Sequence, residues 1–132
     1  MAHANHALVR RFIDAMSAGA ISDDLVTEDF EVFIVAHRER ASKDAYARGI
    51  ALLPRVFPEG LSFRIRSLTA EDDRVIAEFS GDGTTAGGAH YHNDYLYLFR
   101  IRDGKVCFLA EYLDLDAMRG VLIPAMQALA KD

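Results

Sequence analysis

The sequence predicts an α+β fold, in which a curved sheet, mixed or antiparallel, wraps around three helices as a cone with an internal pocket. Two observations predict it. Up to Phe57, apolar residues mostly follow helical spacing, and beyond that point they form short runs of period two. These runs succeed one another like antiparallel strands, and a last helical segment follows them. Helices gathered beside such a sheet are typical of α+β proteins, and 132 residues suffice for a single domain, residues 1–132.

The N-terminal part of the chain predicts two helices and a strand. Residues 5–18 place apolar side chains at helical spacing, and Gly19 is a natural stop. Ser22 is a suitable N-cap for a short second helix over residues 23–28, since the acidic side chains of its first turn favour a helix N-terminus. A strand over Phe30–Ala36 is expected next.

A polar connection over His37–Ala41 should lead to a third helix. Ser42 is the expected N-cap of this helix, which begins at Lys43. Pro54 lacks a backbone donor, so the helix should kink or stop there. Its inner stripe consists of Tyr46, Ile50, Leu53 and Phe57.

Four short strands are expected in the second half. Leu61–Ala70 and Arg74–Gly81 are runs of period two, and the four glycines between Gly81 and Gly88 predict a loop or a bulged edge. His90–Asp114 then contains two aromatic and β-branched runs around an Asp-Gly turn, which is the pattern of an antiparallel hairpin.

The C-terminal segment predicts one more helix. Asp114 or Asp116 can cap it, and it should run to about Leu122. Pro124 should interrupt it, which would leave residues 125–130 as a last turn or a frayed tail.

The first strand of the hairpin has two different faces, because side chains alternate along a strand. One face carries Tyr91, Asn93, Tyr95, Tyr97, Phe99 and Ile101. The other carries His90, His92, Asp94, Leu96, Leu98 and Arg100. The middle of the strand is apolar on both faces, so both should be covered. A chain of this length has few helices to spare, and we therefore expect a homodimer formed through the sheet.

Glu111 is the candidate catalytic residue. It lies between Leu109 and Leu113 on a mostly apolar face, where a carboxylate shifts its pKa or finds hydrogen bonds. Its expected neighbours are Tyr91, Asn93, Tyr95 and Tyr97. Aromatic side chains with a few convergent polar groups usually form a small-molecule site. A structural alternative stays open, in which tyrosine hydroxyls or an arginine such as Arg64 or Arg66 hold the carboxylate.

Composition argues against several classes of function. The net charge is −5 and no long Lys/Arg cluster occurs, so we expect no nucleic-acid partner. No stretch approaches the length of a membrane span or a signal peptide, and the lone Cys107 suits a reducing compartment, so a cytoplasmic protein is expected. His90 and His92 share a face at strand spacing, but no clear further ligand accompanies them. We therefore expect neither a metal nor a cofactor.

Several of these segments together resemble a known family. A Y-x-N-x-Y strand (residues 91–95), F-R-I-R-D-G-K-V (residues 99–106) and E-Y-L-D (residues 111–114) are similar to the SnoaL-like branch of the nuclear transport factor 2-like superfamily. Ketosteroid isomerase, polyketide cyclases and limonene-epoxide hydrolase share that fold. The resemblance covers nearly the whole chain. It implies a cystatin-like α+β cone, commonly a dimer formed through the sheet.

Steroid isomerisation does not carry over with the fold. By approximate alignment, the two hydrogen-bond donors and the general base of ketosteroid isomerase fall on Phe12, Tyr97 and Ile34. The base is missing and the first donor has lost its hydroxyl. A donor without a base does not isomerise a steroid, so we expect a different reaction.

The epoxide hydrolase pattern is also incomplete. Its last aspartate falls on Glu111, but its arginine and first aspartate fall near Glu78 and Ser80. Polyketide cyclases of this fold need one acid/base carboxylate in an apolar cavity, and Glu111 could meet that requirement.

Two functions remain open. The first is a small-molecule enzyme of isomerase, cyclase or hydrolase type, with Glu111 as acid/base on an apolar, carbonyl-bearing substrate. The second is a non-catalytic dimeric module for ligand binding or association. An open cavity lined by Glu111 and at least two tyrosine hydroxyls would favour the first, and a closed cavity or an arginine beside Glu111 the second. The residues expected to bind the ligand are Phe12, Met16, Tyr46, Leu53, Tyr91, Asn93, Tyr95 and Tyr97.

Overall fold

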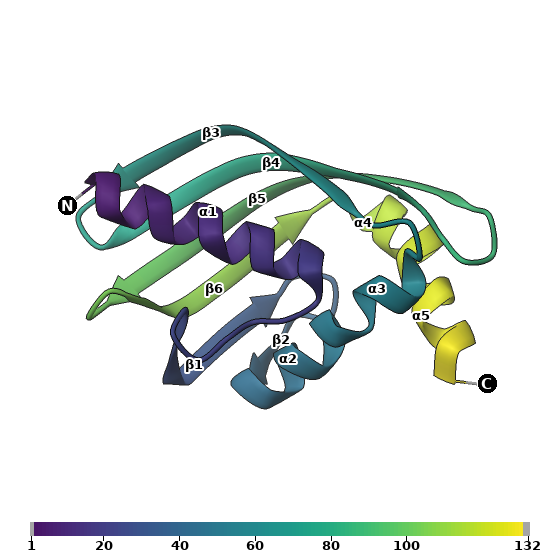
Figure 1. Cartoon of the computed structure of the whole chain (residues 1–132), viewed down its shortest axis with the longest axis horizontal. Helices are drawn as coiled ribbons and strands as arrows, with labels where there is room; N and C mark the ends of the chain where they lie inside the picture. The colour runs from purple at the N-terminus through teal and green to yellow at the C-terminus, as the bar shows by residue number, and fades with distance from the viewer. Residues whose placement is uncertain (1, 131–132) are drawn as a thin grey trace.

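The computed structural model describes residues 2–130, with side chains from residue 4 onward. One curved sheet has the strand order β2–β1–β6–β5–β4–β3, and the helices lie against its inner side (Figure 1). The strands are β1 (Val26–Ile34), β2 (Glu39–Ser42), β3 (Ser62–Glu71), β4 (Arg74–Thr84), β5 (His90–Arg102) and β6 (Lys105–Leu113). The helices are α1 (Ala2–Ala18), α2 (Lys43–Ala51), α3 (Leu53–Val56), α4 (Leu115–Ala117), the π-helical segment η1 (Met118–Leu122) and α5 (Ile123–Ala130).

The predicted fold class is confirmed: a mixed, curved sheet surrounds three helical units, which are α1, α2 with α3, and α4 with η1 and α5. Figure 1 shows α1 lying across the sheet, while the other two units close one end of the cone. The apolar stripe of α1 is buried, with Val9 and Phe12 fully covered. Gly19 ends this helix as predicted, with a φ of 79° that suits glycine.

The helix predicted over residues 23–28 is wrong. The chain makes a turn after Ser22, with the Leu25 N–H donating to the Ser22 carbonyl at 3.0 Å, and then enters β1 at Val26. Strand β1 pairs in parallel with β6 and buries Phe30 and Val32. This pairing joins segments some 80 residues apart, and it outweighs the local capping signal.

The polar connection predicted after the first strand also forms a strand. β2 pairs antiparallel with β1 from Glu39 to Ser42 as an edge strand with mostly exposed side chains. Backbone hydrogen bonds to β1 stabilise this strand, and it buries few apolar side chains. The apolar alternation by which a strand is recognised in a sequence is therefore missing. The predicted cap is confirmed, because Ser42 Oγ accepts the Ala45 N–H at 3.2 Å. The break at Pro54 is confirmed as well: α2 ends at Ala51 and α3 begins at Leu53.

The loop or bulged edge predicted between Gly81 and Gly88 begins later than expected. β4 continues to Thr84, so Gly81 and Gly83 lie within the strand, opposite Asn93 and Tyr91 of β5. A Cβ atom at Gly83 would lie 2.8 Å from the ring of Phe57. The glycines therefore let aromatic rings approach the strand closely.

The hairpin of β5 and β6 is confirmed, with positive φ at Asp103 and Gly104 in its two-residue turn. Asp114 caps the C-terminal helix, as predicted, by accepting the Asp116 N–H at 3.0 Å. The predicted interruption at Pro124 is wrong, because the helix continues to Ala130. Pro124 lies in the first turn of α5, directly after the wide π-helical turn, where a missing donor is tolerated.

The two faces of β5 differ as predicted. The face that carries Tyr91, Asn93, Tyr95, Tyr97, Phe99 and Ile101 is buried. The outer face of the sheet exposes apolar side chains on three neighbouring strands, namely Ile76 (40%), Leu96 (49%) and Tyr112 (47%). No helix in the described part of the chain is long and apolar enough to cross a membrane.

Candidate functional site

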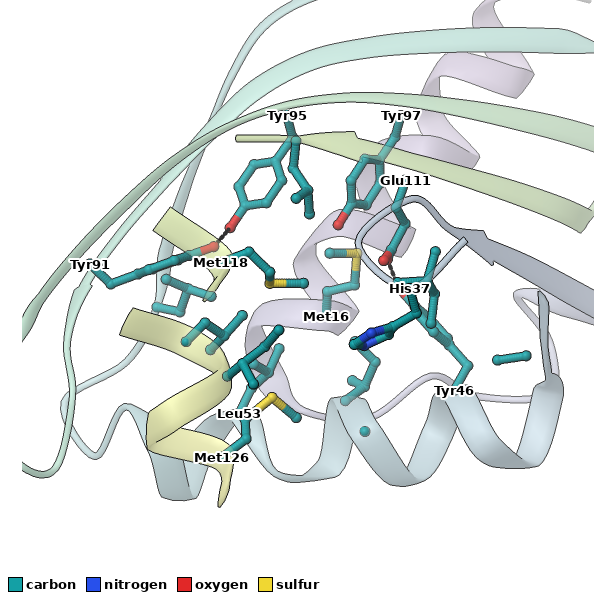
Figure 2. Close-up of a pocket in the computed structure, with 18 of the residues that line it drawn as sticks. Met16, His37, Tyr46, Leu53, Tyr91, Tyr95, Tyr97, Glu111, Met118 and Met126 are labelled. Atoms are coloured by element: carbon teal, nitrogen blue, oxygen red, sulfur yellow. Dashed lines mark hydrogen bonds between the residues drawn. The ribbon is translucent and has the colours of Figure 1, made fainter. Parts of the chain in front are cut away.

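A cavity of about 170 Å³ lies between the inner face of the sheet and the three helical units (Figure 2). Its lining is mostly apolar and includes three methionines, Met16 of α1, Met118 of η1 and Met126 of α5. An apolar cavity of about 150 Å³ is large enough to bind benzene. The cavity therefore fits a compound of about one ring. Its polar lining consists of His37, Tyr46, Tyr91, Tyr95, Tyr97 and Glu111.

Glu111 is the only carboxylate in this lining among residues 4–130. Strand β6 places it between Tyr97 of β5 and Ile34 of β1, so its side chain points inward from the middle of the sheet. It is 6% exposed, and the Tyr46 hydroxyl of α2 donates a hydrogen bond to its Oε2 at 3.0 Å. Figure 2 shows the carboxylate pointing into the cavity beside Tyr97.

The environment of Glu111 brings its pKa into the neutral range. Burial raises the pKa from its ordinary value of 4.5 to about 7, although hydrogen bonds from the Tyr46 and Tyr97 hydroxyls act in the opposite direction. Near pH 7 the carboxyl group therefore populates both forms. Such a group can accept a proton and return it, as general acid/base catalysis requires.

The tyrosines around Glu111 remain hydrogen-bond donors. Burial raises the pKa of Tyr46 and Tyr97 well above 10, and the negative charge of Glu111 raises it further. No lysine or arginine of residues 4–130 lines the cavity. Of the two structural partners left open by the sequence, the arginines do not contact Glu111: Arg66 pairs with Asp94 at 3.3 Å, with both side chains at least half exposed, and Arg64 is exposed. Tyrosine hydroxyls, those of Tyr46 and Tyr97, are the polar groups beside the Glu111 carboxylate.

A second polar group of the cavity is built on β5. The Tyr91 and Tyr95 hydroxyls are 2.8 Å apart, and Asn93 Nδ2 donates to the Tyr91 hydroxyl at 2.9 Å. Asn93 also bonds to the backbone of Asp114, donating from Nδ2 to its carbonyl at 3.1 Å and accepting its N–H on Oδ1 at 2.8 Å. These residues were expected beside Glu111, whereas the structure gives them a separate hydrogen-bond network.

Most of the residues expected to bind a ligand line the cavity: Met16, Tyr46, Leu53, Tyr91, Tyr95 and Tyr97. Phe12 and Asn93 are not in its lining. Phe12 is fully buried, and its ring packs against the rings of Phe30, Tyr46 and Phe99 at centroid distances of 5.3 to 6.4 Å. Asn93 is fully buried too, and the backbone of Asp114 holds its amide. Both act behind the wall rather than at its surface.

Sequence reasoning missed the contribution of the C-terminal helix, which lines the cavity with Met118, Leu122, Ile123 and Met126. The interruption predicted at Pro124 hid Met126, whereas Met118 and Leu122 lie within the part of the helix that the sequence predicted and were not recognised as lining residues. His37 begins the polar connection that the sequence predicts after the first strand, where it could be solvated or point to the mouth of the cavity. It is exposed, and it also lines the cavity (Figure 2). The turn that carries it is tied to the site, since the Val35 N–H donates to the Glu111 carbonyl at 3.4 Å.

The histidine pair of β5 lies on the other face of the sheet, away from the cavity. His92 contacts Asp82 at 2.8 Å and Asp94 at 3.3 Å. These two carboxylates raise the pKa of His92, the hydrogen bond to Asp82 contributing most. Among the described residues, no group of three His, Cys, Asp or Glu side chains is arranged to hold a metal ion.

The family comparison matches the SnoaL-like domain over residues 9–109. An uncharacterized PhzA/B-like protein of Pseudomonas aeruginosa is 36% identical over an alignment of 76 residues, with a coverage of 51% of this chain and 54% of that protein. The match thus spans about half the length of that relative.

Solved structures share the whole fold. A proposed SnoaL-like polyketide cyclase from Jannaschia sp. has a TM-score of 0.76 at 20% identity, covering 90% of this chain and 91% of that one. PrhC from Penicillium brasilianum has a TM-score of 0.79 at 16% identity, covering 98% and 91%. At these identities the structures establish the fold alone.

Proposed function

The chain belongs to the SnoaL-like domain family, and on that premise we propose that it is an enzyme that moves protons on a small, apolar, carbonyl-bearing compound. Glu111 is the proposed acid/base. One observation carries the proposal: the only carboxylate of the cavity lining among the described side chains is buried, with a pKa of about 7. The likeness to a proposed polyketide cyclase agrees with this class of reaction.

The proposed reaction begins at a carbon next to a carbonyl group. The carboxylate of Glu111 takes a proton from that carbon, and the electron pair of the C–H bond moves onto the carbonyl oxygen as an enolate. The protonated Glu111 then returns the proton to carbon, at the same or a conjugated position. No other reactant is needed for this isomerisation. In a cyclisation, the enolate carbon would instead attack a second carbonyl of the same molecule, and Glu111 would protonate the new alkoxide.

The walls of the cavity would supply binding energy and exclude water. Met16 and Leu53 offer apolar contact from the helices, and methionine adapts its shape to irregular ligands. Tyr46 and Tyr97 would hold the Glu111 carboxylate by hydrogen bonds before it takes the proton and after it returns it.

The proposal can be tested without the natural substrate. Acetophenone, a single-ring ketone, exchanges its methyl protons for deuterium in D₂O when a base removes them, and proton NMR measures the rate. We expect exchange catalysed by the wild type, reduced about a hundredfold or more in Glu111→Gln, since general-base catalysis contributes about 10²–10⁴ in rate. Glu78→Gln, which changes an exposed carboxylate of β4, is the matched control and should keep the wild-type rate.

The result that contradicts the proposal is equal exchange in the wild type and in Glu111→Gln. Binding of acetophenone with no catalysed exchange in either protein would favour the alternative, a non-catalytic ligand-binding module of the same fold.

A further inference from the structure

The amide of Asn93 has a fixed orientation. Its Oδ1 accepts the Asp114 N–H, and one hydrogen of Nδ2 donates to the Asp114 carbonyl. The backbone thus determines which end of the amide is which, because an N–H cannot accept and a carbonyl cannot donate. The second hydrogen of Nδ2 then donates to the Tyr91 hydroxyl. Both Nδ2 hydrogens are therefore used, and Asn93 has no donor left to offer a ligand.

Counting hydrogens leaves one donor unused in the cavity wall. Tyr91 and Tyr95 have two hydroxyl hydrogens, and only one of them can lie between the two oxygens, 2.8 Å apart. If Tyr91 donates to Tyr95, the hydroxyl hydrogen of Tyr95 has no acceptor in this pair. If Tyr95 donates to Tyr91, the hydroxyl hydrogen of Tyr91 has none. Within the described part of the chain, no other acceptor receives it. Both hydroxyls belong to the cavity lining, and Figure 2 shows them meeting at its wall.

The rings that carry this donor are held rigidly. Phe79 stacks on Tyr95 with ring centroids 4.7 Å apart, and Phe57 packs on Tyr91 at 5.5 Å. A Cβ atom at Gly81 would lie 3.1 Å from the Tyr95 ring, so glycine allows the ring to lie against β4. The donor is therefore preorganised, which lowers the cost of ordering it around a ligand.

Two features set the chemistry that this donor recognises. Burial raises the pKa of both tyrosines, so they remain protonated and require an acceptor. Glu111 already places a carboxyl group in the cavity lining, and no lysine or arginine among residues 4–130 accompanies it, so the lining favours a neutral ligand group over an anionic one. A neutral oxygen acceptor, such as a ketone or aldehyde, satisfies both conditions.

The donor pair lies on the same face of β5 as Tyr97, the cross-strand partner of Glu111. Tyr95 precedes Tyr97 by two residues, so the Cα atoms of these two tyrosines are about 7 Å apart along the strand, at roughly 3.4 Å per residue. We propose that the Tyr91–Tyr95 pair is a carbonyl-binding site and that the substrate is a ketone or aldehyde of about one ring, with its oxygen on this pair and its reacting carbon facing Glu111. This inference rests on the proposed function. Asn93 is then a positioning residue that acts through Tyr91.

The test compares acetophenone with α-methylstyrene, which has a CH₂ group in place of the carbonyl oxygen. Binding of each is measured by ligand-observed NMR, and the carbonyl stretching frequency of bound ¹³C-labelled acetophenone is measured by infrared spectroscopy. For the wild type we expect acetophenone to bind about two- to tenfold more tightly, the value of one neutral hydrogen bond, and its carbonyl frequency to fall.

The preference and the frequency shift should disappear in the double variant Tyr91→Phe/Tyr95→Phe and persist in Tyr112→Phe, which alters an exposed tyrosine of the outer face. Each single variant should retain the preference, because the remaining hydroxyl then lacks a protein acceptor. The single variants also keep the test decisive if the double variant fails to fold. Loss of the preference for acetophenone in Tyr95→Phe would contradict the inference that the pair has one hydroxyl hydrogen without a protein acceptor.

Three further results would overturn the inference: equal binding of the two probes by the wild type, binding of neither at millimolar concentration, or an unchanged carbonyl preference in the double variant. The same measurement on Glu111→Gln separates the two proposals. A preference retained there, with catalysed exchange absent from the wild type as well, would uphold the carbonyl site and reject acid/base catalysis.

Discussion

At the scale of single residues, the position of Glu111 on β6 determines its chemistry. Alternation along the strand turns it inward, and the sequence pattern was sufficient to predict this. Its partners were harder to predict. Tyr46 lies 65 residues away on α2, and only the packing of that helix brings its hydroxyl to the carboxylate. Asn93 has its main partners in the backbone of Asp114, which no side-chain pattern reveals.

The raised pKa of Glu111 makes stability depend on pH. A carboxyl group whose pKa is 4.5 when unfolded and about 7 when folded favours the folded state fully below pH 4.5. This contribution is lost as the pH rises to about 7, and 2.5 pKa units correspond to about 3 kcal/mol. Glu111→Gln should therefore gain stability relative to the wild type, by up to about 3 kcal/mol, between pH 4.5 and pH 8.

Urea unfolding at both pH values measures this difference, with Glu78→Gln as the control that should show no such change. A difference between Glu111→Gln and the wild type that does not vary with pH would show that the folded protein does not raise this pKa.

At the scale of elements, the sequence predicts those whose signals are local. The cap at Ser42, the break at Pro54 and the Asp-Gly turn of the hairpin depend on neighbouring residues and are all present. β1 could not be recognised over residues 26–29, because it is stabilised by parallel pairing with a distant strand. The C-terminal helix was predicted too short because the π-helical turn before Pro124 has no clear sequence signature.

The glycines of β4 offer a prediction at this scale. A Cβ atom at Gly83 would lie 2.8 Å from the buried ring of Phe57, so Gly83→Ala must displace that ring and should cost about 1–3 kcal/mol. Gly49→Ala is the control: this glycine is in the interior of α2 with no atom within 4 Å of the new Cβ, and alanine should stabilise the helix by about 0.5–1 kcal/mol. Thermal unfolding should give a melting temperature below that of the wild type for Gly83→Ala and above it for Gly49→Ala. A Gly83→Ala protein that melts at the wild-type temperature would contradict the close packing of Phe57 against this glycine.

At the scale of the whole molecule, alternation and the α+β order predicted the fold class, and the inner face of β5 came out as expected. The volume of the cavity could not be predicted, because it depends on how three helical units pack against a curved sheet. The outer face remains apolar at its centre, where Leu96 lies opposite Tyr112 in the sheet.

We propose that this outer face joins two copies of the chain in a homodimer. Light scattering should give the mass of a dimer at micromolar concentration, and Leu96→Glu should give a monomer, because the added charge would be buried without a partner. Gln127→Glu adds the same charge to an exposed residue of α5 and should remain dimeric. A wild-type monomer would reject the proposed dimer.

The central claim is that the folded protein holds Glu111 with a pKa near 7, ready to exchange protons at neutral pH. Carbon-13 NMR of protein labelled at the glutamate carboxyl groups measures this directly, with Glu111→Gln identifying the signal. We expect one carboxyl resonance to titrate near pH 7 while those of exposed glutamates titrate below pH 5, and that resonance to be absent from the variant. A Glu111 signal that titrates near pH 4.5 would contradict the account.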